Sequence, residues 1–136
     1  MSGTADMAGL PADYPFRPEF ELTPRQVLEM QRANPASVLI IDVRTKPEWD
    51  FVHVEGAEHI PLDEIERRAS EVQPEPGQIV ATLCHHGVRS LKASLALRHL
   101  GVPGAMSIAG GIDSWSLGAD ATVARYERQG GRCWKV

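Results

Sequence analysis

The chain has 136 residues, of which 43 % are hydrophobic and 24 % are charged, and its net charge is −4 at pH 7. This length fits one domain whose core is large enough to fold without disulfide or metal staples. The acidic balance argues against nucleic-acid binding, because phosphate contacts need clustered Lys and Arg. The sequence shows neither a signal peptide nor an apolar run approaching the ~20 residues of a membrane span. We therefore expect a cytoplasmic protein with no nucleic-acid and no membrane partner.

Residues 1–21 show little periodicity, so we expect an irregular N-terminal arm. Its aromatic content favours docking onto the core, through Tyr14, Phe16 and Phe20. A helix is expected to begin after Thr23, because threonine is a good N-cap and Pro24 is favoured at the first helical position. This helix should end near Ala33, before the Asn-Pro pair that follows.

The rest of the chain alternates strand-like and helical segments. Short apolar runs such as VLIID suit parallel strands that are buried on both faces. Strands are expected at 38–42, 79–83 and 105–109, and helices at 47–52, 62–72, 90–100 and 112–116. This alternation predicts an α/β fold in three layers, with a mostly parallel sheet flanked by helices on both faces. We expect the domain to span 22–126 and residues 127–136 to form an irregular tail.

The segment CHHGVRS at 84–90 follows a predicted strand and leads into a predicted helix. Ligands of parallel sheets bind beyond the carboxyl ends of the strands, where this loop should lie. A cysteine is nucleophilic as the thiolate, which backbone N–H groups, a helix N-terminus and a cation all favour. Gly87 lets the loop turn inward, Arg89 supplies the cation and Ser90 opens the helix. The loop therefore predicts Cys84 as the nucleophile for an anionic substrate.

Two other interpretations of this segment compete with that one. A free cysteine at a strand end is often only a small buried hydrophobic residue. Metal binding by Cys84, His85 and His86 is not expected, because adjacent ligands rarely converge on one ion and no second pair has zinc spacing. The two imidazoles could instead tune the pH dependence near neutrality. Cys133 is read as a spare tail cysteine, with a resolving or relay thiol as the alternative.

The spacing of the loop distinguishes sulfur from phosphate chemistry. Cysteine-dependent phosphatases place five residues between cysteine and arginine, which builds a cradle for a tetrahedral phosphate. Here four residues separate Cys84 from Arg89, and Ser90 occupies the position of the phosphatase arginine. The shorter loop makes a smaller cradle, which suits a cysteine that carries one extra sulfur atom.

Three motifs in order resemble the single-domain rhodanese (sulfurtransferase) family, over roughly Leu22 to Tyr126. The segment LIIDVRTKPEWDFVHVEGAEHIPL is similar to the first motif of the family, CHHGVRS to its six-residue active-site loop and AGGIDSW to its C-terminal motif. The matching first-motif positions are Asp42, Arg44, Glu48, Trp49, His53, Gly56, Ala57, Ile60 and Pro61.

The resemblance implies a double-displacement sulfurtransferase that needs no cofactor. Cys84 would take sulfane sulfur from a small donor such as thiosulfate and pass it, as a persulfide, to a thiol or to cyanide. The loop residues would hold the sulfur and the donor: His85, His86, Gly87, Val88, Arg89 and Ser90. Arg89 would steer the donor dianion. The alternative is a relay or docking module that hands persulfide sulfur to a sulfur-carrier protein in cofactor biosynthesis, and an inactive scaffold is disfavoured because Cys84 is present.

Most first-motif residues are expected to support the fold. Arg44 and Glu48 lie four positions apart and could form an ion pair, and an exposed pair of this kind is worth only ~0.3–0.5 kcal/mol. Asp42, at the end of a strand, should shape the neighbouring loop through structural hydrogen bonds. His53 and His59 are expected to make local hydrogen bonds, and Trp115 to be a core or lid aromatic.

Overall fold

Five parallel strands form the central sheet of the computed structural model, which describes residues 10–136. Their spatial order is β1-β5-β4-β2-β3. The strands are β1 (Glu21–Leu22), β2 (Val38–Asp42), β3 (Glu58–His59), β4 (Ile79–Leu83) and β5 (Met106–Ile108). Strands β2 and β4 have the bounds expected at 38–42 and 79–83. Strand β5 is one residue shorter at each end than the strand expected at 105–109. The predicted parallel sheet is confirmed.

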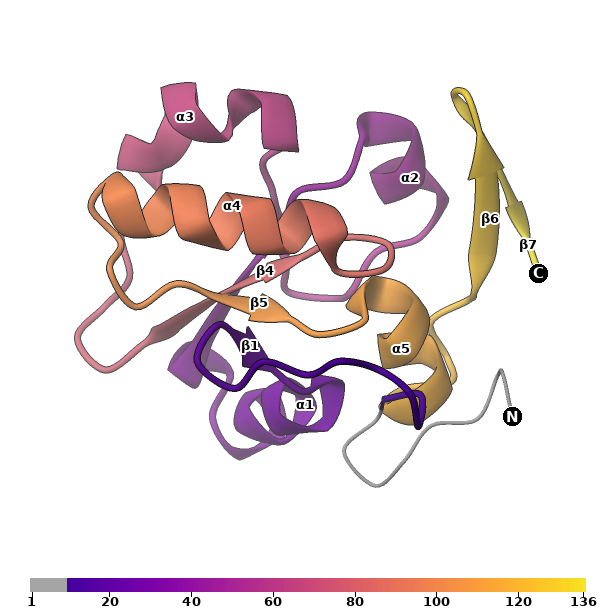
Figure 1. Ribbon diagram of the computed structural model, residues 1–136, viewed down its shortest axis with the longest axis horizontal. Coiled ribbons are helices and arrows are strands. Elements are labelled where there is room, and N and C mark those ends of the chain that lie inside the picture. The colour runs from indigo at the N-terminus through magenta and orange to yellow at the C-terminus, as the bar shows by residue number, and fades with distance from the viewer. Residues whose placement is uncertain (1–9) are drawn as a thin grey trace.

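Helices cover both faces of this sheet (Figure 1). They are α1 (Pro24–Ala33), α2 (Lys46–Phe51), α3 (Ile65–Arg68), α4 (Val88–His99) and α5 (Gly111–Gly118). On one face, α3 and α4 bury a core that includes Ile65, Ala69 and Leu97. On the other face, Val27 of α1 packs in one cluster with Trp115 of α5. The three-layer α/β architecture follows from these two cores, and no helix within residues 10–136 is long and apolar enough to cross a membrane.

Local signals explain the bounds of α1. The Thr23 hydroxyl accepts a hydrogen bond from the Gln26 backbone N–H at 3.1 Å, and the Gln26 side chain accepts one from the Thr23 N–H at 2.8 Å. This reciprocal capping box satisfies two backbone donors that the helix leaves free. The helix expected at 62–72 is instead split, because short 3-10 turns at 62–64 and 69–71 flank α3.

The described part of the N-terminal arm packs on the domain. Leu10 is buried, and the Tyr14 hydroxyl donates a hydrogen bond to the Glu21 carboxylate. Burial and this carboxylate raise the pKa of Tyr14 to about 12. Residues 10–21 therefore dock as expected, whereas the first nine residues of the predicted arm lie outside the described part of the chain.

The C-terminal segment forms a hairpin, so the prediction of an irregular tail was wrong. Strands β6 (Tyr126–Gln129) and β7 (Arg132–Lys135) pair in antiparallel register around Gly130-Gly131. A Gly-Gly pair between two short strands is a standard hairpin signal, and Gly130 has the positive φ of +60° that favours glycine. The hairpin stands beside α2 (Figure 1). The predicted boundary between residues 126 and 127 therefore falls inside β6.

Candidate active site

The loop that carries Cys84 lies where β4 ends and α4 begins. Cys84 follows the last residue of β4, and α4 begins at Val88, two residues before the expected start. Gly87 is the N-cap, with a φ of +107°. A Cβ atom there would also lie only 3.1 Å from the Tyr14 hydroxyl oxygen and 3.2 Å from the Gly110 nitrogen. Glycine is therefore needed both for the turn and for the close packing of the loop.

Polar groups surround the sulfur of Cys84, a residue that is 1 % exposed. The Gly87 N–H donates a hydrogen bond to Sγ at 3.0 Å. The hydroxyl oxygen of Ser90 lies 3.4 Å from Sγ and 2.7 Å from the hydroxyl oxygen of Ser107. Because α4 begins early, Ser90 lies within its first turn, next to the sulfur. The backbone donor of Gly87 suits an anionic sulfur atom at this point.

The N-terminus of α5 supports the loop from behind. The Ile112 N–H donates to the Cys84 carbonyl at 2.7 Å, and the Asp113 N–H donates to the His85 carbonyl at 3.1 Å. Gly111 has a φ of +65°, and a Cβ there would lie 2.4 Å from the His85 carbonyl oxygen. The AGGIDSW segment therefore supplies a helix start that approaches the loop backbone directly.

Arg89 is paired with Glu48 rather than free. Its two terminal amino groups donate to the two carboxylate oxygens of Glu48, at 2.6 Å and 2.9 Å. Glu48 is buried and also accepts hydrogen bonds from the Thr45 backbone and from the Tyr126 hydroxyl. Burial raises the pKa of Glu48, but the hydrogen bonds from Arg89 and Tyr126 outweigh burial and hold that pKa far below its usual range. The charge of Arg89 is thus compensated by Glu48.

The ion pair that the spacing of Arg44 and Glu48 allows does not form. Arg44 is fully buried and binds the Asp42 carboxylate, with Nη2 at 2.7 Å and Nε at 2.9 Å. Its contact with Glu48 is to the backbone carbonyl, from Nη1 at 3.3 Å, and Nη1 also donates to the Tyr126 hydroxyl oxygen at 3.1 Å. Helix α2 begins at Lys46, so Arg44 lies outside the helix and the i,i+4 rule for neighbouring side chains does not apply. Asp42 and Arg44 instead hold the ends of β2 and α2 together.

His85 is buried against the hairpin. Its ring stacks on Tyr126, with ring centroids 4.1 Å apart, and its Nε2 lies 3.0 Å from the Tyr126 carbonyl oxygen, to which it donates. Burial and the neighbouring His86 lower the pKa of His85 to about 4. The imidazole is therefore neutral at pH 7. The expectation that His85 tunes activity near neutrality does not hold.

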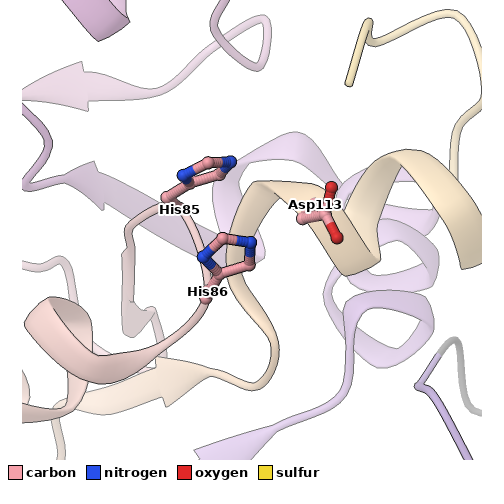
Figure 2. Close-up of side chains that lie close together, drawn as sticks. All are labelled: His85, His86 and Asp113. Carbon is pink, nitrogen blue, oxygen red and sulfur yellow. The ribbon is translucent and has the colours of Figure 1, made fainter. Parts of the chain in front are cut away.

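His85, His86 and Asp113 form a cluster that the sequence did not indicate (Figure 2). One potential ligand atom from each residue lies within 4.8 Å of the others. The two imidazoles are stacked 3.9 Å apart and 27° from parallel, so their in-plane lone pairs do not converge on one ion. The Asp113 carboxylate is paired with Arg125 at 2.9 Å. These contacts are those of loop packing against α5 rather than of a metal centre.

A pocket of about 540 Å³ opens over the Cys84 loop. The loop supplies most of its wall, and the C-terminal hairpin supplies the rest. Its lining residues are Cys84, His85, His86, Val88, Arg89, Glu127 and Arg128. The structure therefore brings most of the predicted loop residues to one pocket, whereas Asp42 and Arg44 are not among its lining residues and bind each other where β2 meets α2. Glu127 and Arg128 were missed, because the tail was read as irregular.

A family model for the rhodanese-like domain matches residues 23–117. The chain belongs to this family. The rhodanese-like match confirms the resemblance drawn from the three motifs and ends before the hairpin, which lies outside the matched residues.

Proteins with similar sequences are named as sulfurtransferases. The chain is 32 % identical over 105 residues to the probable adenylyltransferase/sulfurtransferase MoeZ of Mycobacterium tuberculosis, a match of 77 % of this chain and 26 % of that protein. It is 30 % identical over 95 residues to the thiosulfate sulfurtransferase GlpE of Actinobacillus pleuropneumoniae, covering 70 % of this chain and 84 % of that one. The chain thus spans about a quarter of MoeZ but most of GlpE.

Solved structures share the fold. A rhodanese-like domain protein from Staphylococcus aureus has a TM-score of 0.63 and 27 % identity, and covers 76 % of this chain and 95 % of that one. The human single-domain sulfurtransferase TSTD1 has a TM-score of 0.57 and 25 % identity, and covers 74 % and 96 % of the two chains. Both are single-domain proteins of similar extent.

The remaining candidates serve local structure. His53 stacks on Trp49 and lies 2.8 Å from the Trp49 carbonyl oxygen, and His59 lies 2.7 Å from the Arg44 carbonyl oxygen. Trp115 is 1 % exposed and belongs to the core rather than to a lid. Cys133 is half-buried, and burial raises the pKa of its thiol.

Proposed function

We propose that this rhodanese-like protein is a sulfurtransferase that moves sulfane sulfur from thiosulfate, or a similar donor, to a thiophilic acceptor. Cys84 is the nucleophile. The observation that carries the proposal is the position of the Cys84 sulfur, which accepts the Gly87 N–H at the start of α4 and lines an open pocket. Relatives named as thiosulfate sulfurtransferases support it.

In the first step, the Cys84 thiolate attacks the outer sulfur of thiosulfate. A new S–S bond forms, the S–S bond within thiosulfate breaks, and sulfite leaves with the bonding electron pair. The product is a Cys84 persulfide anion. Its outer sulfur occupies the pocket above the loop, where backbone N–H groups of residues 85–90 stabilise the negative charge.

In the second step, a nucleophilic acceptor takes the outer sulfur. Cyanide becomes thiocyanate, or a thiolate becomes a persulfide, and the electron pair of the broken S–S bond returns to the Cys84 sulfur as thiolate. No external oxidant or reductant is needed, because the donor brings the sulfur already at the sulfane level. Donor and acceptor react in turn with the same sulfur atom, which is a ping-pong cycle.

The remaining predicted site residues surround this centre. Asp42 and Arg44 hold the end of β2, and Ser90 places a hydroxyl beside the sulfur. Arg89 lines the pocket, but Glu48 compensates its charge and so weakens its pull on a dianionic donor.

Steady-state thiocyanate formation from thiosulfate and cyanide tests this proposal. We expect parallel lines in double-reciprocal plots at several cyanide concentrations, and no thiocyanate from a Cys84→Ser variant. A Cys133→Ser variant is the matched control and should retain the wild-type rate. Intersecting lines, or a Cys84→Ser variant that keeps activity, would contradict the mechanism.

A sulfur-relay role is the second candidate, favoured by relatives that bear the names MoeZ and putative sulfur carrier protein YrkF. In that role the donor is a protein persulfide, such as that of a cysteine desulfurase, and the acceptor is a sulfur-carrier protein. Sulfur loading of Cys84 from a desulfurase but not from thiosulfate would select this role over the first.

A further inference from the structure

The pocket above Cys84 has a second arginine, from outside the residues that match the family. Arg128 is in β6, whereas the match ends at residue 117. Arg128 lines the pocket together with Cys84 and Arg89. Its closest approach to Glu48 is through Nε at 3.5 Å, and its side chain is 38 % exposed. The Arg89 side chain is only 20 % exposed and holds Glu48 at 2.6 Å. Arg128 is therefore the looser and more accessible of the two cations.

The register of the hairpin explains why Arg128 faces the site. Side chains of successive strand residues alternate between two faces, so Tyr126 and Arg128 share one face. Tyr126 is buried against His85 and Glu48, which fixes that face toward the domain. Cys133 is the cross-strand partner of Arg128, and it packs at the edge of the same core. The hairpin thus projects the guanidinium of Arg128 toward the pocket.

The charges around the pocket leave Arg128 as the available cation. Glu48 carries one negative charge, which the bidentate contact with Arg89 compensates. Asp113 is paired with Arg125. The hairpin contributes Glu127 as the only carboxylate among the described lining residues, and its neighbour Arg128 as a second cation.

We propose that Arg128 is the residue that binds the anionic end of the sulfur donor and makes the site selective for anionic donors. This inference rests on the proposed function, because the role given to Arg128 is to position the end of the donor that leaves as sulfite. Arg128 binds the sulfonate oxygens while the outer sulfur faces Cys84. The ligand class is a small sulfur donor with a sulfonate or similar anionic group next to the sulfane sulfur.

The first test measures thiosulfate loading of Cys84 in a Cys133→Ser background, by intact mass over time. Arg128→Gln should lower the second-order rate about tenfold, because electrostatic steering toward the thiolate is lost. Arg128→Lys keeps the charge and should stay within about threefold of the parent. Arg132→Gln is the matched control, because it removes the same charge from β7 at a residue that does not line the pocket. It should load at the parent rate.

The second test does not depend on sulfane transfer. The Cys84 thiolate attacks the sulfenyl sulfur of a methanethiosulfonate, forms a mixed disulfide and releases methanesulfinate. We compare the anionic sulfonatoethyl reagent with the neutral hydroxyethyl reagent in the same background. Arg128→Gln should lower the anionic-to-neutral rate ratio about fivefold and leave the neutral rate unchanged. Glu127→Gln should raise the ratio, because it removes the opposing charge.

The outcomes separate this proposal from the proposed function. If Arg128→Gln matches Arg132→Gln in thiosulfate loading and in the reagent ratio, the role of Arg128 is overturned while the sulfurtransferase proposal stands. If the parent protein is not loaded by thiosulfate, the donor assignment fails for both proposals. A lowered reagent ratio in that case still identifies Arg128 as the cation that selects anionic ligands.

Discussion

Glu48 connects the active-site loop to the C-terminal hairpin. It accepts hydrogen bonds from Arg89 of α4 and Tyr126 of β6, and it is 0 % exposed. A buried carboxylate of this kind is tolerated only because each of its oxygens has charged or polar partners. Removing its charge leaves Arg89 without a counter-charge in a largely desolvated position.

We predict that Glu48→Gln destabilises the protein by about 2–4 kcal/mol, because breaking a buried ion pair leaves one charge uncompensated. The measurement is urea unfolding followed by circular dichroism. Asp50→Asn in the same helix is the matched control, since its pair with Lys46 is solvent-exposed. That variant should lose less than about 0.5 kcal/mol. Equal losses of stability in the two variants would show that the buried contacts of Glu48 stabilise the fold no more than an exposed ion pair does.

His85 gives stability a defined pH dependence. Its pKa in the folded protein is about 4, below the ordinary value of 6.5, so the unfolded chain binds the proton more readily between these values. The contribution of neutral His85 to the free energy of unfolding is complete above pH 6.5. It falls as the pH drops toward 4 and is constant below that pH. From pH 7.5 to 5 it amounts to about 2 kcal/mol.

We therefore predict that His85→Gln, which keeps a side-chain donor for the Tyr126 carbonyl, reduces the loss of stability between pH 7.5 and pH 5 by about 2 kcal/mol. Unfolding free energies at the two pH values are compared. His99→Gln removes an exposed imidazole at the end of α4 and should follow the wild-type curve. A His85→Gln curve parallel to the wild type would refute the buried, neutral state of His85.

At the scale of elements, the site depends on how closely α5 approaches the Cys84 loop. Gly111 allows this approach, since any side chain there would overlap the His85 and Cys84 carbonyls. Gly77 has a similar positive φ of +82°, but a Cβ there would meet nothing within 4 Å. Substitutions at these two glycines therefore distinguish the cost of backbone strain from the cost of crowding the loop.

We predict that Gly77→Ala costs about 1–2 kcal/mol of stability, through the left-handed conformation alone. Sulfur loading of Cys84 should be unchanged in this variant. Gly111→Ala adds the overlap and should cost a further 1–3 kcal/mol, roughly the penalty of overpacking. Because the overlap displaces the loop that holds the sulfur, loading should also fall at least tenfold, a ~1.4 kcal/mol effect on the barrier. Unchanged loading in Gly111→Ala would contradict this account.

Elements were predictable where local chemistry determines them. The capping box at Thr23 and the apolar runs at 38–42 and 79–83 are local signals, and the corresponding α1, β2 and β4 have the expected bounds. Strands β1 and β3 have two residues each, which is too short for any periodic pattern. The hairpin was missed although Gly130-Gly131 signals it, because β6 and β7 carry mostly polar residues and no apolar alternation.

At the scale of the whole molecule, the sequence predicted the loop that holds Cys84 but not the charges around it. Cys84 and Gly87 lie within one loop, so their contact follows from the local turn. The contacts of Glu48 span 41 positions to Arg89 and 78 to Tyr126, and no spacing rule reports such distances. The sequence did not predict Arg128 at the site for the same reason. Arg128 reaches the site through a hairpin whose placement depends on the packing of Tyr126.

The most direct test of the central claim is the intact mass of the reduced protein after incubation with thiosulfate, beside a Cys84→Ser control. We predict a gain of one sulfur atom in the wild type, its removal by cyanide and no gain in the control. A wild-type protein that takes up no sulfur, or a Cys84→Ser variant that does, would contradict the assignment of Cys84 as the sulfur-carrying residue.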